Sequence, residues 1–454
     1  MSNTIYLTTA IPYVNGPPHL GHAVELVEAD VLARAARARG DTIRFLTGTD
    51  ENAPKNVRAA EEAGIPVAEL VARNAARFAE LQAALAISND DFIRTSTDAR
   101  HRPGVERLWR ACAAAGALYE GEYDGLYCAG CEAFVDAPCD EHPGGTERVT
   151  ERNWFFRLSR FRDELVALVG GGALQIVPER RRNEVLAVLR DGLADVSVSR
   201  PAERTRGWGI PVPGDPSQTI YVWFDALANY LTADPVAWRA ADERIHVIGK
   251  GILRFHAVYW PAFLFAAGEP APTTIYVHEY VTTRSGKLSK SSGGGVPPVE
   301  LVRRYGVDPV RWWLLRDGPH ARDAELTEDA LRARANELAD TIGNLVSRTV
   351  ALARRLGVTP PPAKAAPPLG GFEFRRAAAV VAGRAEAANA FASHAQPWAL
   401  PPAEAAAVVT ELARACAVIA AELRPLLPNA ADRIDAALAQ LDAAASRALF
   451  RKAA

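Results

Sequence analysis

The chain opens with alternating stretches of β-forming and helix-forming sequence. Residues 4–10 (TIYLTTA) are rich in β-formers and predict a short strand. Residues 22–40 carry apolar positions at helical spacing and end in Gly40, which predicts a helix. Residues 42–48 (TIRFLTG) predict a second strand. This strand–helix–strand order is typical of a parallel sheet.

The pattern changes in the middle of the chain and then returns. Helical patterns dominate residues 54–118, whereas residues 119–153 carry aromatics, cysteines, Pro and Gly with no sustained period. A short helix at 160–169 and a basic cluster at 180–182 follow. Three further strand candidates each precede a turn or a helix, namely 219–227, 244–251 and 273–281. We therefore expect the sheet to resume after an insertion.

From Thr327 onward the pattern is almost entirely helical. A Pro-rich interruption at 359–371 predicts a loop between helices rather than a domain linker. A length of 454 residues predicts two to four domains.

Charge and hydropathy exclude several classes of protein. Lys and Arg number 52 against 54 Asp and Glu, which excludes a globally basic nucleic-acid binder but leaves room for a local basic patch. No apolar run reaches the roughly 18 residues that a membrane span needs. Residues 1–10 lack a basic start and an apolar segment, so we expect no secretory signal and a cytoplasmic protein.

A first candidate for phosphate binding is the sequence His19-Leu20-Gly21-His22, where the first strand's loop enters the first helix. Helix N-termini offer unpaired N–H groups and a positive dipole, so anions bind there. Gly21 permits close approach of a nucleotide to the backbone. The two imidazoles share one helical face and can donate to the same phosphate. The alternative is a solvated or metal-binding pair of histidines.

A second candidate is the sequence Lys287-Leu288-Ser289-Lys290-Ser291, which a Gly-rich stretch follows. It holds two of only six lysines in the chain. A loop of this kind can close over a triphosphate and place ammonium groups against a leaving pyrophosphate. The alternative is a solvated surface loop.

Four residues of metal-ligating type occur at paired spacing. Cys128, Cys131, Cys139 and His142 form a C-x2-C-x7-C-x2-H pattern, and three thiolates with one imidazole suit a closed tetrahedral Zn²⁺ site. With all four positions filled, we expect a structural site that stabilises a short insertion. The alternative is a loop of unligated thiols.

The HLGH and KLSKS motifs together, at opposite ends of a split parallel sheet, resemble the class I aminoacyl-tRNA synthetases. Further segments resemble the methionyl-tRNA synthetase family within that class, from about residue 4 to about residue 430: PYVNGPPHLGH, FLTGTDE, YVWFDAL, FHAVYWPA and GNLVSRT. The resemblance implies ATP-dependent attachment of L-methionine to methionine tRNA through methionyl-adenylate. It also implies ATP with Mg²⁺, a structural Zn²⁺, no membrane partner and a monomer.

The resemblance also implies the residues of each site. The implied catalytic residues are His19, His22, Lys287, Lys290 and Arg200. ATP binding would use Gly21, Gly249, Lys250, Ser289 and Ser291 together with His19, His22, Lys287 and Lys290. Methionine binding would use Ile11, Tyr13, Asp50, Trp223, Ala226, Leu227, Tyr230, Ile252, His256 and Trp260, with Asp50 on the substrate amine. Anticodon binding would use Asn344, Arg348 and Trp398.

The predicted fold class is α/β, with a Rossmann-like parallel-sheet catalytic domain split by a connective insertion and followed by an all-α anticodon-binding bundle. The expected boundaries are 1–115 and 211–275 for the halves of the catalytic domain, 116–210 for the insertion with its zinc knuckle at about 125–145, 276–325 for a KLSKS-bearing stem-contact region and 326–454 for the helical domain.

Four positions depart from the family's usual pattern. Asn52 stands where histidine is usual, Glu279 where glycine is usual, and Gly294 where asparagine commonly stands. Gly251 replaces an aspartate, a loss that could weaken ATP binding or be compensated by Glu279. These departures favour an alternative, a paralogue that makes an aminoacyl-adenylate or aminoacyl-tRNA for small-molecule biosynthesis, but Asn344, Arg348 and Trp398 argue against it.

Two further alternatives are an inactive tRNA-binding regulator and a nucleotidyltransferase. Intact HLGH and KLSKS argue against the first, and the predicted knuckle and helical tail argue against the second.

Overall fold

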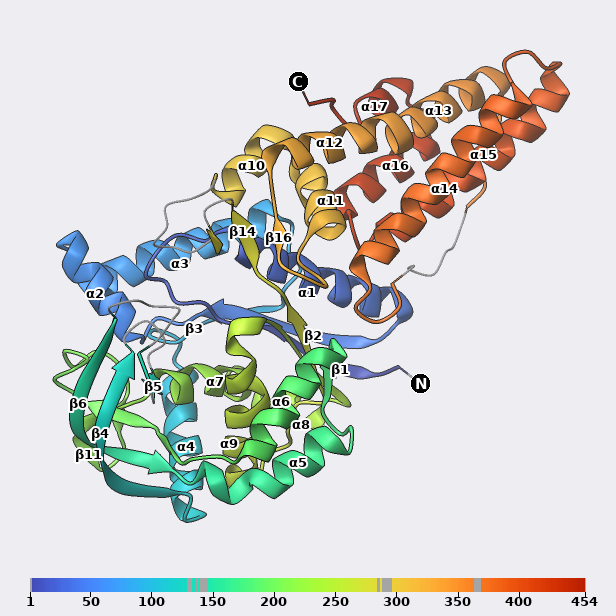
Figure 1. Cartoon of the computed structure of the whole chain (residues 1–454). Coiled ribbons are helices and arrows are strands. Elements are labelled where there is room, and N and C mark those ends of the chain that lie inside the picture. The colour runs from blue at the N-terminus through green and yellow to red at the C-terminus, as the bar shows by residue number, and fades with distance from the viewer. Residues whose placement is uncertain are drawn as a thin grey trace.

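The computed structural model describes residues 2–128, 133–135, 137–138, 145–283, 286–287, 296–362 and 369–453. In these ranges a central parallel sheet lies between an antiparallel insertion and a long helical region (Figure 1). None of the helices within these ranges is long and apolar enough to span a bilayer.

The central sheet is parallel, as predicted. Its strand order is β3-β2-β1-β12-β13-β7, and every neighbouring pair is parallel. Chain order therefore reverses between β1 and β12, which is where open α/β sheets bind ligands. The strands are β1 (Thr4–Thr9), β2 (Thr42–Thr49), β3 (Asp91–Arg94), β7 (Gln175–Val177), β12 (Glu243–Gly249) and β13 (Thr274–His278).

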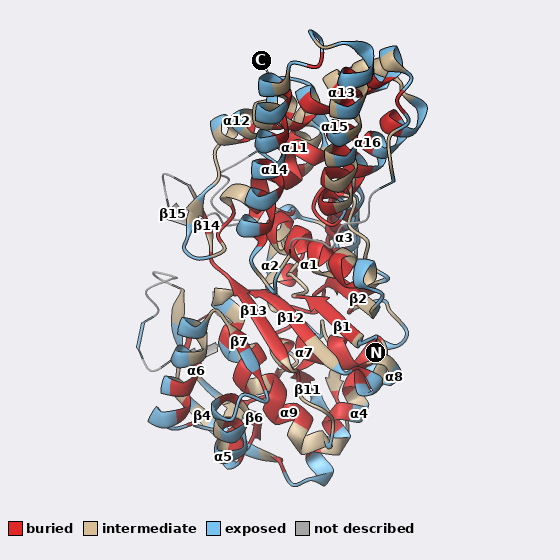
Figure 2. Cartoon of the chain, turned by 90° about the vertical axis from the view of Figure 1, so that its right-hand side faces the viewer, coloured by how far each residue is buried: buried red, intermediate tan, exposed pale blue. Residues whose placement is uncertain are grey.

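Alternate residues of β1 pack into different cores on the two faces of this sheet. Ile5 and Leu7 pack against the first helix and the helical region, whereas Tyr6 packs with the helices on the opposite face. Both faces are therefore covered, and the central strands are buried (Figure 2). The helices of this domain are α1 (Leu20–Arg39), α2 (Pro54–Ala63), α3 (Val67–Ala84), α4 (His101–Ala114), α7 (Val222–Thr232), α8 (Pro235–Ala240) and α9 (Trp260–Ala267).

The insertion is built on an antiparallel sheet that periodicity did not predict. Its order is β5-β4-β6-β8, and β4 and β6 pair over eleven positions, from Leu118↔Phe156 to Cys128↔Thr146. A second small sheet has the order β10-β11-β9. The elements are β4 (Leu118–Cys128), β5 (Ala133–Val135), β6 (Thr146–Phe156), α5 (Arg162–Gly170), α6 (Glu179–Asp191), β8 (Val196–Ser197), β9 (Ser199–Pro201), β10 (Pro211–Val212) and β11 (Asp215–Ile220), with a 3₁₀ turn at Leu158–Phe161.

The C-terminal part is helical, as predicted. Its helix α11 packs against α1. The Pro-rich segment lies between α13, which ends at Leu356, and α14, which begins at Phe374, and its residues 363–368 lie outside the described part of the chain. The elements are β14 (Val281–Thr283), β15 (Gly286–Lys287), α10 (Pro298–Tyr305), α11 (Val307–Asp317), β16 (Ala324–Glu325), α12 (Glu328–Leu338), α13 (Asn344–Leu356), α14 (Phe374–Ala395), α15 (Pro402–Leu423), α16 (Pro428–Gln440) and α17 (Ala443–Arg447).

The strand predicted at 219–227 is wrong beyond its first residues. β11 ends at Ile220 and α7 begins at Val222. Ten of the eleven residues of α7 are buried, so the helix has no polar face to show a 3.6-residue period. A short apolar run of this kind does not distinguish a strand from a buried helix.

Candidate active site

The HLGH motif forms the N-terminus of α1 at the carboxyl edge of the sheet. His19 is the N-cap, and its Nδ1 accepts a hydrogen bond from the Gly21 N–H at 3.1 Å. His22 Nδ1 accepts from the His19 N–H at 3.0 Å, which completes a reciprocal capping box. A Cβ on Gly21 would lie 2.9 Å from the His19 ring, so glycine is needed for this cap.

This cap determines the chemistry of both histidines. Because each Nδ1 accepts a backbone hydrogen bond, the ring proton of His19 and of His22 is on Nε2. The two rings lie 3.8 Å apart, centre to centre. The helix N-terminus therefore presents two N–H donors side by side, an arrangement that suits an anionic group.

The residues predicted for a thioether side chain come together from three segments of the chain. Trp223 lies edge-on to Tyr13 at 6.3 Å and to His256 at 6.4 Å. Tyr230 lies edge-on to Trp260 at 6.0 Å. Ala226 and Leu227 are buried on the same helix, α7, and Ile11 and Ile252 pack against the same core.

Sequence reasoning missed Phe255, whose ring stacks on Trp223 at 3.8 Å. It lies within the quoted segment FHAVYWPA, which was the available signal. Phe255 and His256 belong to a π-helical turn, Phe255–Tyr259, between β12 and α9. Such turns are frequent at functional sites.

His256 is a neutral, fully oriented imidazole. Burial lowers its pKa to about 4. Its Nδ1 lies 2.9 Å from the Ile252 carbonyl oxygen, so the proton is on Nδ1, and Nε2 accepts from the Tyr230 hydroxyl at 2.8 Å. The site therefore offers a polar but uncharged edge among the aromatic rings.

Asp50 lies beside Tyr13 at the end of β2. The two residues form an isolated parallel bridge, and Asp50 is buried. Asn52, the departure from histidine, has a structural partner, because its Nδ2 donates to Asp225 at 2.7 Å. Asp225 in turn lies 2.6 Å from His101 Nε2. The asparagine thus belongs to a buried polar network behind Asp50.

Two further departures, Gly251 and Glu279, follow the ends of β12 and β13. Glu279, directly after β13, is buried and receives hydrogen bonds from Arg180 and Arg181 of α6. Lys250, directly after β12, lies 3.1 Å from Glu279 and 2.6 Å from Asp323. Glu279 therefore joins the insertion to the carboxyl edge of the sheet. The Lys250 ammonium is already paired with two carboxylates.

This cluster predicts an acid-sensitive contribution to stability. Burial alone raises the pKa of Glu279, but hydrogen bonds from Arg181, Lys250 and Arg180 outweigh it and bring the pKa to about 2. Since an unfolded glutamate titrates near about 4.3, the contribution is complete above that pH and is lost as pH falls toward 2. We expect the thermal midpoints of Glu279→Gln and the unmodified chain to differ at pH 6 and to converge between about pH 5 and 2.

The matched control for that comparison is Glu164→Gln, on the exposed face of α5. We expect its midpoint to follow the unmodified chain throughout. A constant difference between Glu279→Gln and the unmodified chain down to pH 2 would contradict an ionised, cation-bound Glu279.

Gly251 is explained by its neighbour Tyr280 rather than by Glu279. A Cβ on Gly251 would collide with the Tyr280 hydroxyl and lie 3.3 Å from its ring carbon Cζ. Lys250 Nζ lies 4.4 Å from the centre of the same ring. A tyrosine hydroxyl therefore fills the space beside this glycine, and compensation by Glu279 stays a prediction.

Sequence reasoning also missed Glu25 and His278. Glu25 accepts the Ala10 N–H at 3.0 Å and lies 3.1 Å from His278 Nε2. Burial lowers the pKa of His278, but Glu25 and Glu28 outweigh it and raise the pKa to about 9. The available signal was helical spacing, because Glu25 follows His22 by three residues on α1.

Arg200 lies in β9 and is buried. Its guanidinium donates to the Ser199 carbonyl at 2.7 Å and lies 4.3 Å from the Tyr221 ring. Several predicted residues lie outside the described part of the chain, namely Ser289, Lys290, Ser291, Gly294, Cys131, Cys139 and His142. Among the residues that are described, no group of three or more His, Cys, Asp or Glu side chains could hold a metal ion.

The three residues predicted to contact the anticodon occupy one end of the helical region. Trp398 is 46% exposed, and the Arg348 guanidinium lies 5.0 Å from its ring centre. Asn344 is exposed one turn before Arg348, at the start of α13 and directly after a π-helical turn, Ala339–Gly343. An exposed tryptophan beside an arginine suits stacking on an unpaired base.

A parallel sheet with a histidine-capped helix at its switch point, split by an insertion and followed by a helical region, is the architecture of a class I tRNA synthetase. The family model described as "tRNA synthetases class I (M)" matches residues 5–139 and 135–350.

Individual relatives indicate which synthetase of this class the chain resembles. The methionine–tRNA ligase of Rhizobium meliloti is 43% identical over 77% of this chain and 71% of its own length. That of Mycobacterium leprae is 43% identical over 79% of this chain and 70% of its own. A crystal structure of Mycobacterium tuberculosis methionyl-tRNA synthetase bound by methionyl-adenylate has a TM-score of 0.86 and 36% identity, covering 95% of this chain and 93% of that one. The chain belongs to the methionyl-tRNA synthetase family.

Proposed function

We propose that this chain attaches L-methionine to methionine tRNA at the expense of ATP, as a methionine–tRNA ligase. The observation that carries the proposal is the juxtaposition of two chemistries at one sheet edge: the paired Nε2 donors of His19 and His22, and the aromatic cluster beside Asp50. The first suits the phosphates of ATP, and the second suits a thioether with an amine.

In the first step, a carboxylate oxygen of methionine attacks the α-phosphorus of ATP, and the bond to the β-phosphate oxygen breaks. Methionyl-adenylate and pyrophosphate result. Positioning and charge stabilisation are sufficient for this reaction. His19 and His22 would hold the phosphates against the α1 N-terminus, while Lys287 and Lys290, with Ser289 and Ser291, would close over the β- and γ-phosphates. Mg²⁺ bound with ATP would neutralise further phosphate charge.

On the nucleotide side, Gly21 and Gly249 would allow close approach to the backbone. Lys250 would act as a fixed cation whose charge Glu279 and Asp323 already balance. On the amino-acid side, Asp50 would bind the methionine amine. The neutral His256–Tyr230 pair and the rings of Tyr13, Trp223 and Trp260 would surround the side chain.

In the second step, a terminal ribose hydroxyl of the tRNA attacks the methionyl carbonyl carbon, and AMP leaves. Asn344, Arg348 and Trp398 would select the tRNA through its anticodon. Arg200 would support activation, with its Nη1 oriented by hydrogen bonds to the Ser197 hydroxyl and the Ser199 carbonyl. We propose that the protein acts as a monomer.

The test is aminoacylation of unfractionated tRNA with each of the twenty amino acids and saturating Mg-ATP. Charging of methionine tRNA with methionine alone is the expected result. Charging with a different amino acid, or none despite ATP–pyrophosphate exchange, would instead support the specialised paralogue.

Gly251 provides a second prediction. If Tyr280 replaces the missing aspartate, then Gly251→Asp forces the tyrosine to move, and strain of about 1–2 kcal/mol should raise the ATP KM by roughly 5- to 30-fold. In the double variant Gly251→Asp/Tyr280→Phe, the colliding hydroxyl is gone, so the ATP KM should fall back toward that of Tyr280→Phe. Both are measured by ATP–pyrophosphate exchange. An ATP KM that Gly251→Asp leaves unchanged or lowers would show that Tyr280 is not the obstacle.

We further propose a structural Zn²⁺ bound by Cys128, Cys131, Cys139 and His142. Strand register supports the fit: Cys128 is the last residue of β4 and lies opposite Ala133, the first residue of β5, and opposite Thr146, the first residue of β6. A bound Zn²⁺ would crosslink that end of the insertion.

Metal analysis of the purified chain should give about one zinc per molecule. Cys131→Ser should reduce that content, whereas Cys416→Ser, in α15, should retain it. Equal metal content in the two variants would overturn the ligand assignment.

A further inference from the structure

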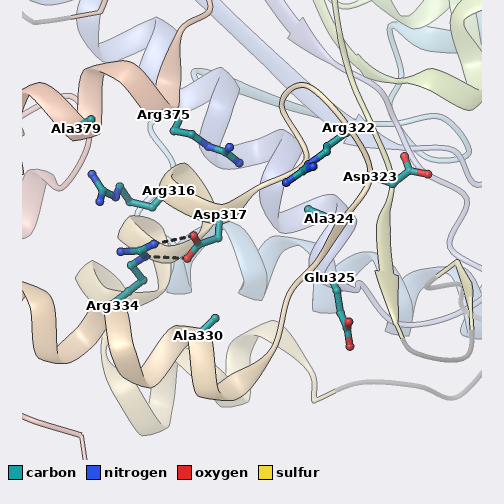
Figure 3. Close-up of a pocket in the computed structure, with 10 residues that line it drawn as sticks. All are labelled: Arg316, Asp317, Arg322, Asp323, Ala324, Glu325, Ala330, Arg334, Arg375 and Ala379. Carbon is teal, nitrogen blue, oxygen red and sulfur yellow. Dashed lines mark hydrogen bonds and ion pairs between the residues drawn. The ribbon is translucent and has the colours of Figure 1, made fainter.

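A hollow of about 730 Å³ lies where α11, α12, β16 and the start of α14 meet (Figure 3). Four arginines line it, namely Arg316, Arg322, Arg334 and Arg375, together with three carboxylates. No role in either step above uses this hollow.

The carboxylates do not neutralise all four arginines. Both oxygens of Asp317 accept from Arg334 at 2.9 Å. Asp323 pairs with Lys250 at 2.6 Å, and Glu325 points away from Arg322 and Arg375 (Figure 3). The acids are therefore committed to other groups or turned from the centre.

Two guanidinium groups remain available across the hollow. Arg322 is exposed and makes no hydrogen bond or ion pair among the described residues. Arg375, also exposed, has a single long hydrogen bond, 3.3 Å to the Gly318 carbonyl. The two side chains point toward one another (Figure 3). Paired guanidinium groups of this kind match the oxygens of a phosphate.

The position of the hollow indicates which phosphate it meets. On one side Asp323 contacts Lys250 and the Tyr280 N–H, next to the nucleotide end of the active site. On the other side α14 begins at Phe374 and runs 22 residues, about 33 Å, to Ala395, three residues before Trp398. A tRNA backbone that ran from the active site toward Trp398 along this side of α14 would pass the hollow.

We propose that Arg322 and Arg375 bind phosphodiester groups of the tRNA backbone, between the acceptor end in the active site and the anticodon on the helical region. The inference rests on the proposed function and adds a sequence-independent contact to it. Backbone contacts of this type contribute affinity and position the nucleic acid, and each makes binding depend more steeply on salt.

The experiment measures the unmodified chain, Arg322→Ala, Arg375→Ala and the double variant with a methionine tRNA transcript. We expect the tRNA KM in aminoacylation to rise by roughly 3- to 10-fold for each single variant and further for the double variant. The slope of log affinity against log salt should fall by about 0.9 for each arginine removed. ATP–pyrophosphate exchange without tRNA should not change.

The matched control is Arg376→Ala, the adjacent exposed arginine of α14, whose guanidinium pairs with Glu373 at 3.0 Å. We expect it to leave the tRNA KM and the salt slope unchanged. The double variant Arg322→Lys/Arg375→Lys keeps both positive charges and should keep most of the salt slope. This variant therefore distinguishes a loss of charge from a loss of folding.

An unchanged tRNA KM and salt slope in the double alanine variant would overturn the proposal. The proposal would also be overturned if inorganic phosphate bound at the hollow without any effect on tRNA binding. Loss of pyrophosphate exchange in the unmodified chain would instead refute the proposed function itself.

Discussion

Replacing His22 with glutamine is expected to lower the rate of methionine-dependent ATP–pyrophosphate exchange by about 100-fold or more, which is typical for removal of one preorganised donor. Glutamine at this position can still accept the His19 N–H and keep the capping box of α1. It removes the imidazole Nε2–H that we propose meets the phosphates. The substitution therefore separates the two roles that the histidine combines.

The control is the fold of the variant. Its circular dichroism spectrum and its thermal midpoint should stay close to those of the unmodified chain, and its methionine KM should change little. Exchange within threefold of the unmodified rate would show that His22 contributes the helix cap but no phosphate contact.

Arg311→Leu is expected to lower the free energy of unfolding by about 3–5 kcal/mol, the usual result of breaking a buried ion pair. Arg311 and its partner Asp30 are both fully buried, 2.7 Å apart. The guanidinium also donates to the carbonyl of Leu85 at 2.9 Å and to that of Leu426 at 2.8 Å. The side chain thus joins α11 to α1, to the end of α3 and to the turn between α15 and α16.

Urea titration of the variant measures the loss, and limited proteolysis should release the helical region more readily. The matched control is Arg239→Leu, which breaks the exposed pair with Glu269 and should cost less than about 1 kcal/mol. Equal losses in the two variants would contradict the view that burial makes the Arg311 pair critical to docking.

Much of the site was predictable because its signals are local. The order of residues 4–48 predicts a strand, a phosphate-binding helix N-terminus and a second strand, and the structure has β1, α1 and β2 there. The His-x-x-His spacing itself places both rings on one turn, as the capping box confirms. The resemblance then pointed to an aromatic set whose members do come together.

Other features depend on pairings between distant residues, which no local pattern contains. β4 and β6 carry no sustained period, yet pair with Leu118 opposite Phe156. β7, inside the range predicted for the insertion, is the edge strand of the parallel sheet. Glu279 was a candidate substitute for the aspartate lost at 251, but it is held by Arg180 and Arg181, about a hundred positions away.

By itself, then, the sequence determined the family, the alternation of strands and helices at the nucleotide site, the helical C-terminal part and the residue types of the site. These follow from periodicity, caps and short motifs, whose information lies within a few residues. Only the tertiary structure decided that Tyr280 explains Gly251, that Arg311 joins α11 to α1, and that Arg322 and Arg375 face one hollow. Each of these depends on side chains that folding brings together, so the physical reason is packing rather than local propensity.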